Sequence, residues 1–409
     1  MRDISRLFSL DEIDHDELMK VFELRYETCW IVAKNQITFP AKPNYSLKIK
    51  SAHGQIDKIY AGDSLSDSEL NSLLDQIDLE LTGNKCTEFG RAVLFANLPV
   101  EGGFRFDSIP MQILPAPARA PRPPQIWADN PFLLEYPIRA SRTPELRTWR
   151  RIKGFVKWAR ILNVLSIGSI RYSGACSRQM WVAKTSLSPE KCFWAHESYI
   201  VPDLEYFKGA LSRRGKSQLP VVPADTYYGD WEKLVIPVNG DIDLRDQLII
   251  PDNLDKLLAA FLSLKGEKRQ KFLRSAAAIY YAKELWDVSF SSSFLACVQA
   301  IEILTVKPSK EPCPACGLNK GDGPTKQVKK IIEKYCSGMA VDKGILDDMY
   351  RVRSSLAHGD YLFQLDESPW AFGISATIAN HREERMMTHA LTIAKEVLRK
   401  WLLENAEQQ

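Results

Sequence analysis

The sequence predicts an α+β N-terminal region followed by an all-α helical bundle. Residues 89–127 contain predicted strands punctuated by Gly and Pro, and residues 167–240 read mostly as strands and loops. From Asn253 onward, apolar side chains recur at helical spacing. With 409 residues, the chain is long enough for two or three domains. We place an N-terminal region at 1–245, with a sub-boundary near 115–125, and a helical domain at 250–409.

Composition limits the classes of function. The net charge is only +3, with 45% hydrophobic and 26% charged residues, so any affinity for nucleic acid must come from local patches. Apolar runs are too short to span a bilayer, and the first residues lack the apolar core of a signal peptide. Eight scattered cysteines then favour reduced thiols. We expect a cytoplasmic protein with no membrane partner.

The first hundred residues contain two predicted helices. An acidic start favours a helix over residues 8–36. A shorter helix is expected from Ser66 or Asp67 to about Leu81, capped by Asp67 or Ser68. Strands are expected at Ala92–Leu98 and Phe104–Ile113, on either side of a Gly pair. The prolines between 115 and 124 then predict an extended arm, or simply a short stiff linker.

Thr143-Pro144-Glu145 predicts a strong helix start, because it offers a capping hydroxyl, Pro in the first turn and a carboxylate near the positive helix end. The helix should run to about Leu165. Its apolar face would bury the following side chains: Leu146, Trp149, Ile152, Val156 and Ala159. Beyond it, strands are expected at 169–172, 179–184, 197–201 and 233–238.

The same helix lies in a basic stretch. Residues 119–160 contain ten basic and three acidic side chains, a local excess of seven positive charges. The exposed candidates for tracking a phosphate backbone are Arg147, Arg150, Arg151, Lys157 and Arg160. The alternative is a solvated helix face whose Arg stems cover apolar surface.

The C-terminal part reads as six helices. Their predicted ranges are 254–262, 272–286, 288–306, 327–335, 346–358 and 382–405, as expected for a bundle. Arg382 and His389 in the last helix are interpreted as part of a solvated face.

The fifth of these helices carries the residues with the clearest chemical meaning. Arg353 lies about 40° from buried Met349 around the helix, so it should face inward. His358 lies on the opposite side at the helix end, where Gly359 can adopt positive φ. His is the usual general acid or base, and Arg suits phosphate recognition. The spacing alone does not bring the two side chains together.

An inward Arg needs an acceptor. In the third helix the apolar stripe consists of Phe294, Cys297, Val298, Ile301 and Thr305, and Glu302 flanks it. We predict that Glu302 pairs with Arg353 across the bundle.

These segments, Gln299-Ala300-Ile301-Glu302-Ile303-Leu304 and Arg353-Ser354-Ser355-Leu356-Ala357-His358-Gly359, resemble the Apea-like branch of the HEPN superfamily. The resemblance covers about residues 255–405 and includes that superfamily's Arg-x4-His motif. Tyr350, in the same helix, adds to it. Ser354 departs from the Asn or Asp that is more usual in the nuclease branches, and Ser is a weaker hydrogen-bonding partner there.

The resemblance implies a HEPN-like bundle that dimerises with its two motifs facing each other. Many family members are metal-independent endoribonucleases associated with prokaryotic abortive infection. His358 would then act as general acid or base, and Arg353 would orient the scissile phosphate, with Glu302, Ser354 and Tyr350 in support. RNA, a second copy of the chain, and a phage-derived trigger or protein partner are the implied partners. The alternative is a catalytically silent module for dimerisation, nucleotide binding or partner binding.

A Cys-x2-Cys pair, Cys313 and Cys316, lies in a Pro- and Gly-rich insertion at 307–325. Its form is that of half a zinc site, since a tetrahedral ion needs four ligands. Cys336 is the nearest further candidate. The alternative is a reduced loop pair. Catalysis would need no cofactor, so any zinc would be structural, and a zinc-stabilised scaffold without a nucleic-acid role is a third hypothesis.

Overall fold

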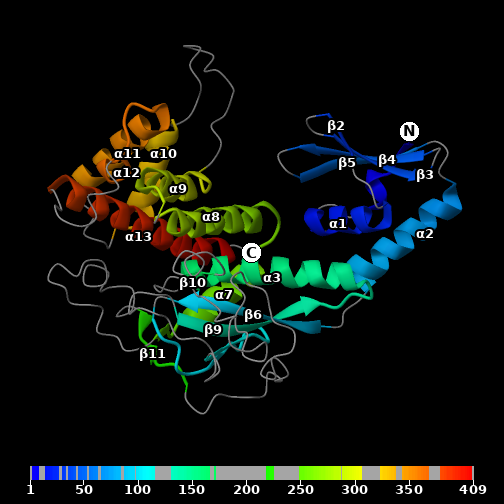
Figure 1. The fold of residues 1–409 in the computed structure, drawn as a ribbon, viewed down its shortest axis with the longest axis horizontal. Helices are drawn as coiled ribbons and strands as arrows, with labels where there is room; N and C mark the ends of the chain where they lie inside the picture. The colour runs from blue at the N-terminus through cyan, green and yellow to red at the C-terminus, as the bar shows by residue number, and fades with distance from the viewer. Residues whose placement is uncertain are drawn as a thin grey trace, which may run out of the picture. The chain divides into compact units, whose positions relative to one another are not determined.

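A computed structural model describes most of the chain. The described residues are 2–8, 14–26, 30–33, 36–42, 45–52, 55–62, 66–83, 87–96, 98–115, 130–165, 170–171, 218–224, 248–286, 288–305, 323–337, 343–367 and 378–407. The model is mixed α and β, with most strands in the N-terminal half and helices at the C-terminus, as predicted (Figure 1).

The chain divides into two compact units. Unit 1 comprises Met1–Gly90 and Pro137–Gly154, and unit 2 comprises Arg91–Tyr136 and Phe155–Gln409. The predicted division into residues 1–245 and 250–409 follows the change from strands to helices. Unit 2, however, combines residues from both sides of that change.

Unit 1 is built on an antiparallel sheet with the strand order β1-β5-β4-β3-β2. The strands are β1 (Arg2–Asp3), β2 (Trp30–Ala33), β3 (Gln36–Lys42), β4 (Tyr45–Ala52) and β5 (Gln55–Ala61). The helical elements are η1 (Ser5–Leu7), α1 (His15–Tyr26), α2 (Asp67–Asp78) and η2 (Leu79–Gly83). The capping residue of α2 is Ser66, whose hydroxyl accepts from the Glu69 amide at 3.3 Å while Glu69 reaches back to the Ser66 amide.

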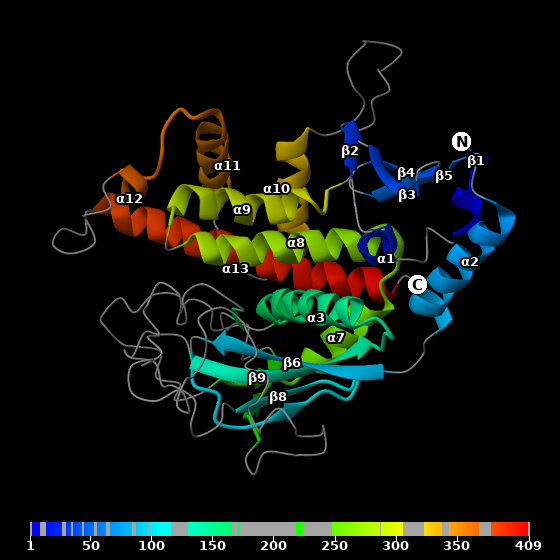
Figure 2. The same cartoon turned by 45° about the vertical axis from the view of Figure 1, so that its right-hand side comes forward.

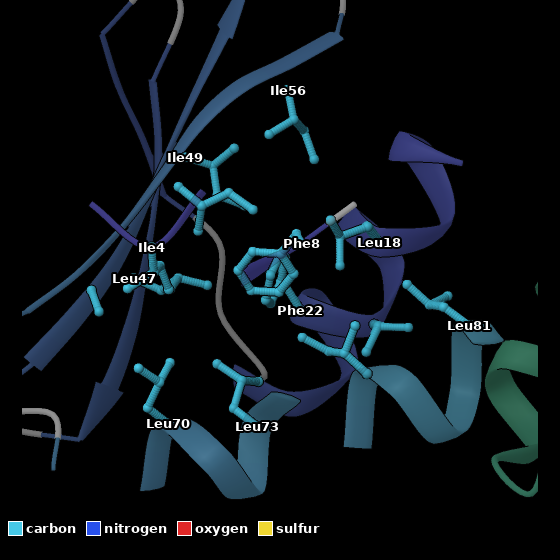
Figure 3. Packing of buried hydrophobic residues seen from close by; sticks show 14 of the residues in the cluster. Ile4, Phe8, Leu18, Phe22, Leu47, Ile49, Ile56, Leu70, Leu73 and Leu81 are labelled. Carbon is cyan, nitrogen blue, oxygen red and sulfur yellow. The ribbon is translucent and has the colours of Figure 1, made fainter. Parts of the chain in front are cut away.

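The core of unit 1 lies between this sheet and its helices. Figure 3 shows Leu18 and Phe22 of α1 facing Leu47 and Ile49 of β4, with α2 closing the cluster through Leu73. Each of these five side chains is buried. Alternating apolar residues on β4 and a helical stripe on α1 therefore meet in one continuous apolar layer.

Unit 2 contains most of a second sheet with the strand order β10-β6-β9-β8-β7, in which β10 pairs with β6, β7 with β8, and β8 with β9 in antiparallel orientation. The strands are β6 (Thr87–Ala96), β7 (Phe104–Arg105), β8 (Gln112–Pro115), β9 (Asn130–Arg139) and β10 (Ile170–Arg171). A short parallel pair, β11 (Val221–Val222) with β12 (Ile250–Pro251), lies apart from it. The long helix α3 (Pro144–Leu165), whose residues up to Gly154 belong to unit 1, matches its prediction. In unit 2, Asp255 of α7 (Leu254–Ser263) fixes the β7–β8 connection by accepting from the Ser108 hydroxyl at 2.7 Å.

The remaining helices form the predicted bundle. They are α7 (Leu254–Ser263), α8 (Gly266–Leu285), α9 (Phe290–Glu302), α10 (Pro324–Tyr335), α11 (Lys343–His358), α12 (Gln364–Glu367) and α13 (Ile378–Glu407). Figures 1 and 2 show α8, α9 and α13 side by side, with α10 and α11 standing against α9. The buried Arg399 of α13 donates to the Val164 carbonyl at 3.2 Å and so ties α13 to the end of α3.

Several predictions of elements need correction. The helix predicted over 8–36 is shorter, because residues 30–33 and 36–42 pair as strands β2 and β3. Ile152, predicted to be buried, is exposed. The predicted strands at 179–184, 197–201 and 233–238, and nearly all of the proline-rich arm, lie outside the described residues. Among the residues that the structure describes, no helix combines the length and apolar character needed to cross a bilayer.

Candidate active site

The predicted ion pair between Glu302 and Arg353 is present. Glu302 lies in the last turn of α9 and Arg353 in the second half of α11, which packs against α9 (Figure 2). The Arg353 Nη2 atom lies 2.9 Å from Glu302 Oε1 and donates to Oε2 at 3.2 Å. The Arg353 side chain is 34% exposed and that of Glu302 24%, so the pair lies at the edge of the bundle.

Only one nitrogen of the Arg353 guanidinium is used in this pair. Within the described residues, Nη2 makes the contacts to Glu302, and Nε and Nη1 have no protein partner. A guanidinium carries five N–H donors in a planar fork. A partly exposed Arg held on one side by a carboxylate therefore keeps donors for a phosphate on the other.

Tyr350 lies one turn before Arg353 and belongs to the same cluster. Its hydroxyl is buried and has no hydrogen-bond partner among the described residues. Burial raises the pKa of Tyr350 well above its usual value, and the Glu302 carboxylate raises it further, against an opposing effect of Arg353. Tyr350 thus stays neutral near pH 7 and lies within electrostatic reach of the Glu302–Arg353 pair.

His358 is the last residue of α11, and its side chain is exposed, as predicted. Its position is set by the backbone that follows. Gly359 has a φ of +77°, its amide donates to the Leu356 carbonyl at 3.2 Å, and the Asp360 amide donates to the Ser355 carbonyl at 2.9 Å. These two bonds form a Schellman motif, which ends the helix sharply at His358. Ser354 is also exposed.

Arg353 and His358 do not form a self-contained site. They lie five positions apart on one helix, which places them about 140° apart around its axis. In the structure Arg353 faces α9, and His358 faces solvent at the helix end. The two candidate catalytic side chains therefore lie on different sides of α11.

Asp366 is a functional candidate that the sequence analysis missed. This carboxylate of α12 accepts from the Phe290 amide at 2.7 Å, the Ser291 amide at 2.8 Å and the Ser289 hydroxyl at 3.0 Å. It therefore caps the N-terminus of α9 from outside the helix and anchors the segment that follows His358. The Ser-rich start of α9 was the available signal, but the partner lies 75 residues further along the chain.

The five predicted RNA-binding residues occupy different environments. Arg147, Arg150 and Arg151 belong to unit 1, whereas Lys157 and Arg160 belong to unit 2. The prediction that Arg150 lies on an exposed basic face is wrong. Its buried guanidinium forms an ion pair with Glu17 and donates to the backbone carbonyls of Glu80 and Ala140.

The other four basic residues are less deeply buried. Arg147 donates to the Ser141 carbonyl at 2.7 Å and lies 3.3 Å from Glu88, while Arg151 is exposed. In unit 2, the Lys157 ammonium lies 4.4 Å from the Trp158 ring centroid, and Arg160 donates to the Tyr281 hydroxyl at 2.6 Å.

The proposed zinc ligands are only partly described. Cys313 and Cys316 lie outside the described residues. Cys336, at the end of α10, is buried, and burial raises the pKa of its thiol to about 12. Within the described ranges, no three His, Cys, Asp or Glu side chains gather closely enough to hold a metal ion.

No family model, curated protein or solved structure matches the chain. The functional assignment therefore depends on the residues of α9 and α11 themselves.

Proposed function

We propose that this protein is a metal-independent endoribonuclease of HEPN type that acts in prokaryotic antiphage defence of the abortive-infection kind. Its proposed location is the cytoplasm, and its partners are RNA, a second copy of the chain, and a phage-derived trigger or protein. The observation that supports this best is the Glu302-anchored Arg353, which within the described residues uses only Nη2, on the same helix that ends in an exposed His358.

The proposed reaction is attack of a ribose 2′-hydroxyl on the adjacent phosphorus. His358 takes the proton of the 2′-hydroxyl, the 2′-oxygen bonds to phosphorus, and the bond to the 5′-oxygen breaks. Arg353 stabilises the negative charge that develops on the phosphate oxygens. A proton returns to the leaving 5′-oxygen, which gives a 2′,3′-cyclic phosphate and a 5′-hydroxyl.

A dimer would resolve the separation of Arg353 from His358. Since the two side chains lie on different sides of α11, the Arg353 of one chain would work with the partner subunit's His358. Two histidines in one site would also supply both proton-transfer roles. Light scattering on the full chain tests this, because a monomer at working concentration contradicts the shared site.

Cleavage of RNA in EDTA tests the activity. Wild type, Arg353→Ala and His358→Ala are incubated with labelled single-stranded RNA, and Arg385→Ala serves as a control because Arg385 is exposed on α13. Cleavage by wild type and the control, with loss in the other two variants, supports the proposal. Absence of cleavage by wild type on any RNA, with or without phage extract, supports the catalytically silent module instead.

A further inference from the structure

Three aromatic rings lead from the core of the bundle to the surface beside His358. Phe294 of α9 and Phe363 are buried, with ring centroids 5.6 Å apart at 65°. The Tyr361 ring lies 6.4 Å from that of Phe363, at 58°, and Tyr361 is 38% exposed. A surface ring supported in this way loses little freedom when a ligand stacks on its outer face.

The backbone holds this ring in a fixed place relative to His358. Tyr361 follows His358 by three residues, directly after the Schellman turn at Gly359. On its other side, the Phe363 amide donates to the Ser291 hydroxyl at 2.9 Å, and Asp366 caps α9. Both ends of the short connection between α11 and α12 are therefore anchored.

Two exposed arginines lie on the helices next to the connection that carries Tyr361, since the Gln364 amide donates to Glu383, the residue after Arg382, at 3.0 Å. Arg351 of α11 and Arg382 of α13 are 70% and 62% exposed, and they share Asp348 at 3.0 and 2.7 Å. Burial raises the pKa of the Tyr361 hydroxyl, and the carboxylates of Glu383 and Asp348 raise it further, while Arg351 and Arg382 oppose that shift.

Arg351 also shares a helix face with His358. The two lie seven positions apart, so they are within about 20° around the helix and about 10 Å apart along it. A strand of nucleic acid that passes His358 along this face would therefore meet Arg351.

We propose that Tyr361, Arg351 and Arg382 form a subsite for a nucleotide of single-stranded RNA next to the phosphate that is cut. The base stacks on the outer face of Tyr361, and the two guanidiniums bind a neighbouring phosphate. This inference rests on the proposed function and adds the residues that hold the substrate. The arginines favour a polyanion over an apolar partner, although exposed Leu362 makes a second copy of the chain the competing occupant.

Binding of a short single-stranded RNA to the full chain tests the subsite. The His358→Ala variant serves as the background, so that the RNA is not consumed. Tyr361→Ala should weaken binding about tenfold, as expected for the loss of one stacked base, and Tyr361→Phe should keep it. Val288→Ala is the control, because Val288 is another exposed apolar side chain of unit 2. A 2-aminopurine base in the RNA should be quenched by the parent and not by Tyr361→Ala.

The outcomes separate this inference from the ribonuclease proposal. Unchanged affinity and unchanged 2-aminopurine emission in Tyr361→Ala would overturn the subsite, even if wild type cleaves RNA. Binding that depends on Tyr361 without any cleavage by wild type would leave the subsite standing and reject the enzyme. A change in molar mass in both Tyr361→Ala and Leu362→Ala would assign the surface to a second copy, and would also overturn the subsite.

Discussion

The Arg353 guanidinium lies 2.9 Å from the Glu302 carboxylate and joins two helices whose paired residues are 51 positions apart. The pair is only partly buried, so its net effect on stability is modest, whereas its effect on the orientation of Arg353 is direct. The proposed role of Arg353 in RNA cleavage depends on this contact, and substitution of Glu302 tests it.

Glu302→Ala should therefore reduce RNA cleavage strongly while lowering the free energy of unfolding by only about 1 kcal/mol. Arg353 would lose its anchor but keep its charge. The measurements are cleavage rate and urea denaturation, with Arg2→Ala as the matched control because Arg2 forms an exposed pair with Asp67. Full cleavage by Glu302→Ala would show that Arg353 needs no anchor.

Arg150→Ala should destabilise the protein by about 3–5 kcal/mol, because it leaves Glu17 without its buried partner and two backbone carbonyls without their donor. Arg151→Ala, at the neighbouring exposed position, should change stability by less than about 0.5 kcal/mol. Denaturation with urea compares the two. Equal stability of the two variants would contradict a structural role for Arg150.

Asp366→Ala should lower the free energy of unfolding by about 1–2 kcal/mol, which is the usual effect of removing a helix cap. It should also speed hydrogen exchange at the start of α9 and in residues 359–363. The exposed neighbour Glu367 supplies the control, Glu367→Ala, which should leave exchange unchanged. Unaltered exchange in Asp366→Ala would mean that α9 holds its first turn without this carboxylate.

Lys395→Met should stabilise the protein at neutral pH. Burial in the bundle lowers the pKa of Lys395 to about 7, and Arg399 and Lys283 act in the same direction. Between about pH 7 and 10.5, the Lys395 side chain is protonated in the unfolded chain and neutral in the folded chain. Its burial therefore lowers the free energy of unfolding most below pH 7, and not at all above about pH 10.5. Lys395→Met should raise the free energy of unfolding by about 1–3 kcal/mol below pH 7, and this increase should vanish as the pH approaches 10.5.

Melting temperatures from pH 6 to 10 measure this trend. Lys256→Met, at an exposed position of α7, controls for the added apolar side chain. A stability difference that stays constant over this range would show that proton release from Lys395 is not its cause.

Cys336→Ser should leave the zinc content of the purified protein unchanged, since the Cys336 side chain is buried and belongs to no metal-holding cluster of His, Cys, Asp or Glu within the described residues. Metal analysis by mass spectrometry, with Cys313→Ser and Cys316→Ser alongside, tests the predicted ligand set. A drop in zinc only in the latter two would locate a site in the insertion. A drop in Cys336→Ser would restore Cys336 as a ligand.

Local signals explain which elements could be predicted. Thr143-Pro144-Glu145 determines the start of α3 within a few residues, and Gly359 determines the end of α11 in the same way. The overlong first helix shows the limit, because residues 30–33 become a strand through pairing with residues 36–42. Tertiary pairing of this kind overrides the local preference.

The same limit applies to charged side chains. Periodicity placed Arg353 correctly, because both helices of the Glu302–Arg353 pair have clear apolar stripes. Arg150 was misplaced, because its partner Glu17 is 133 residues away and no local pattern indicates it. An ion pair between two helices can be inferred from sequence only where the apolar stripes of both helices are clear.

At Gly359, in the turn after His358, the positive φ restricts which residue is tolerated, and crowding by neighbouring atoms does not. Gly359 has a φ of +77°, and a Cβ atom built there would meet no atom within 4 Å. Gly359→Ala would therefore lower the free energy of unfolding by about 1 kcal/mol, because the positive φ strains the backbone of an L-residue. A D-alanine introduced there by chemical ligation would adopt this φ without that backbone strain. The direction in which the chain leaves the histidine accordingly depends on one residue that has no chiral centre, and a D-residue there would fix that direction more firmly than glycine does.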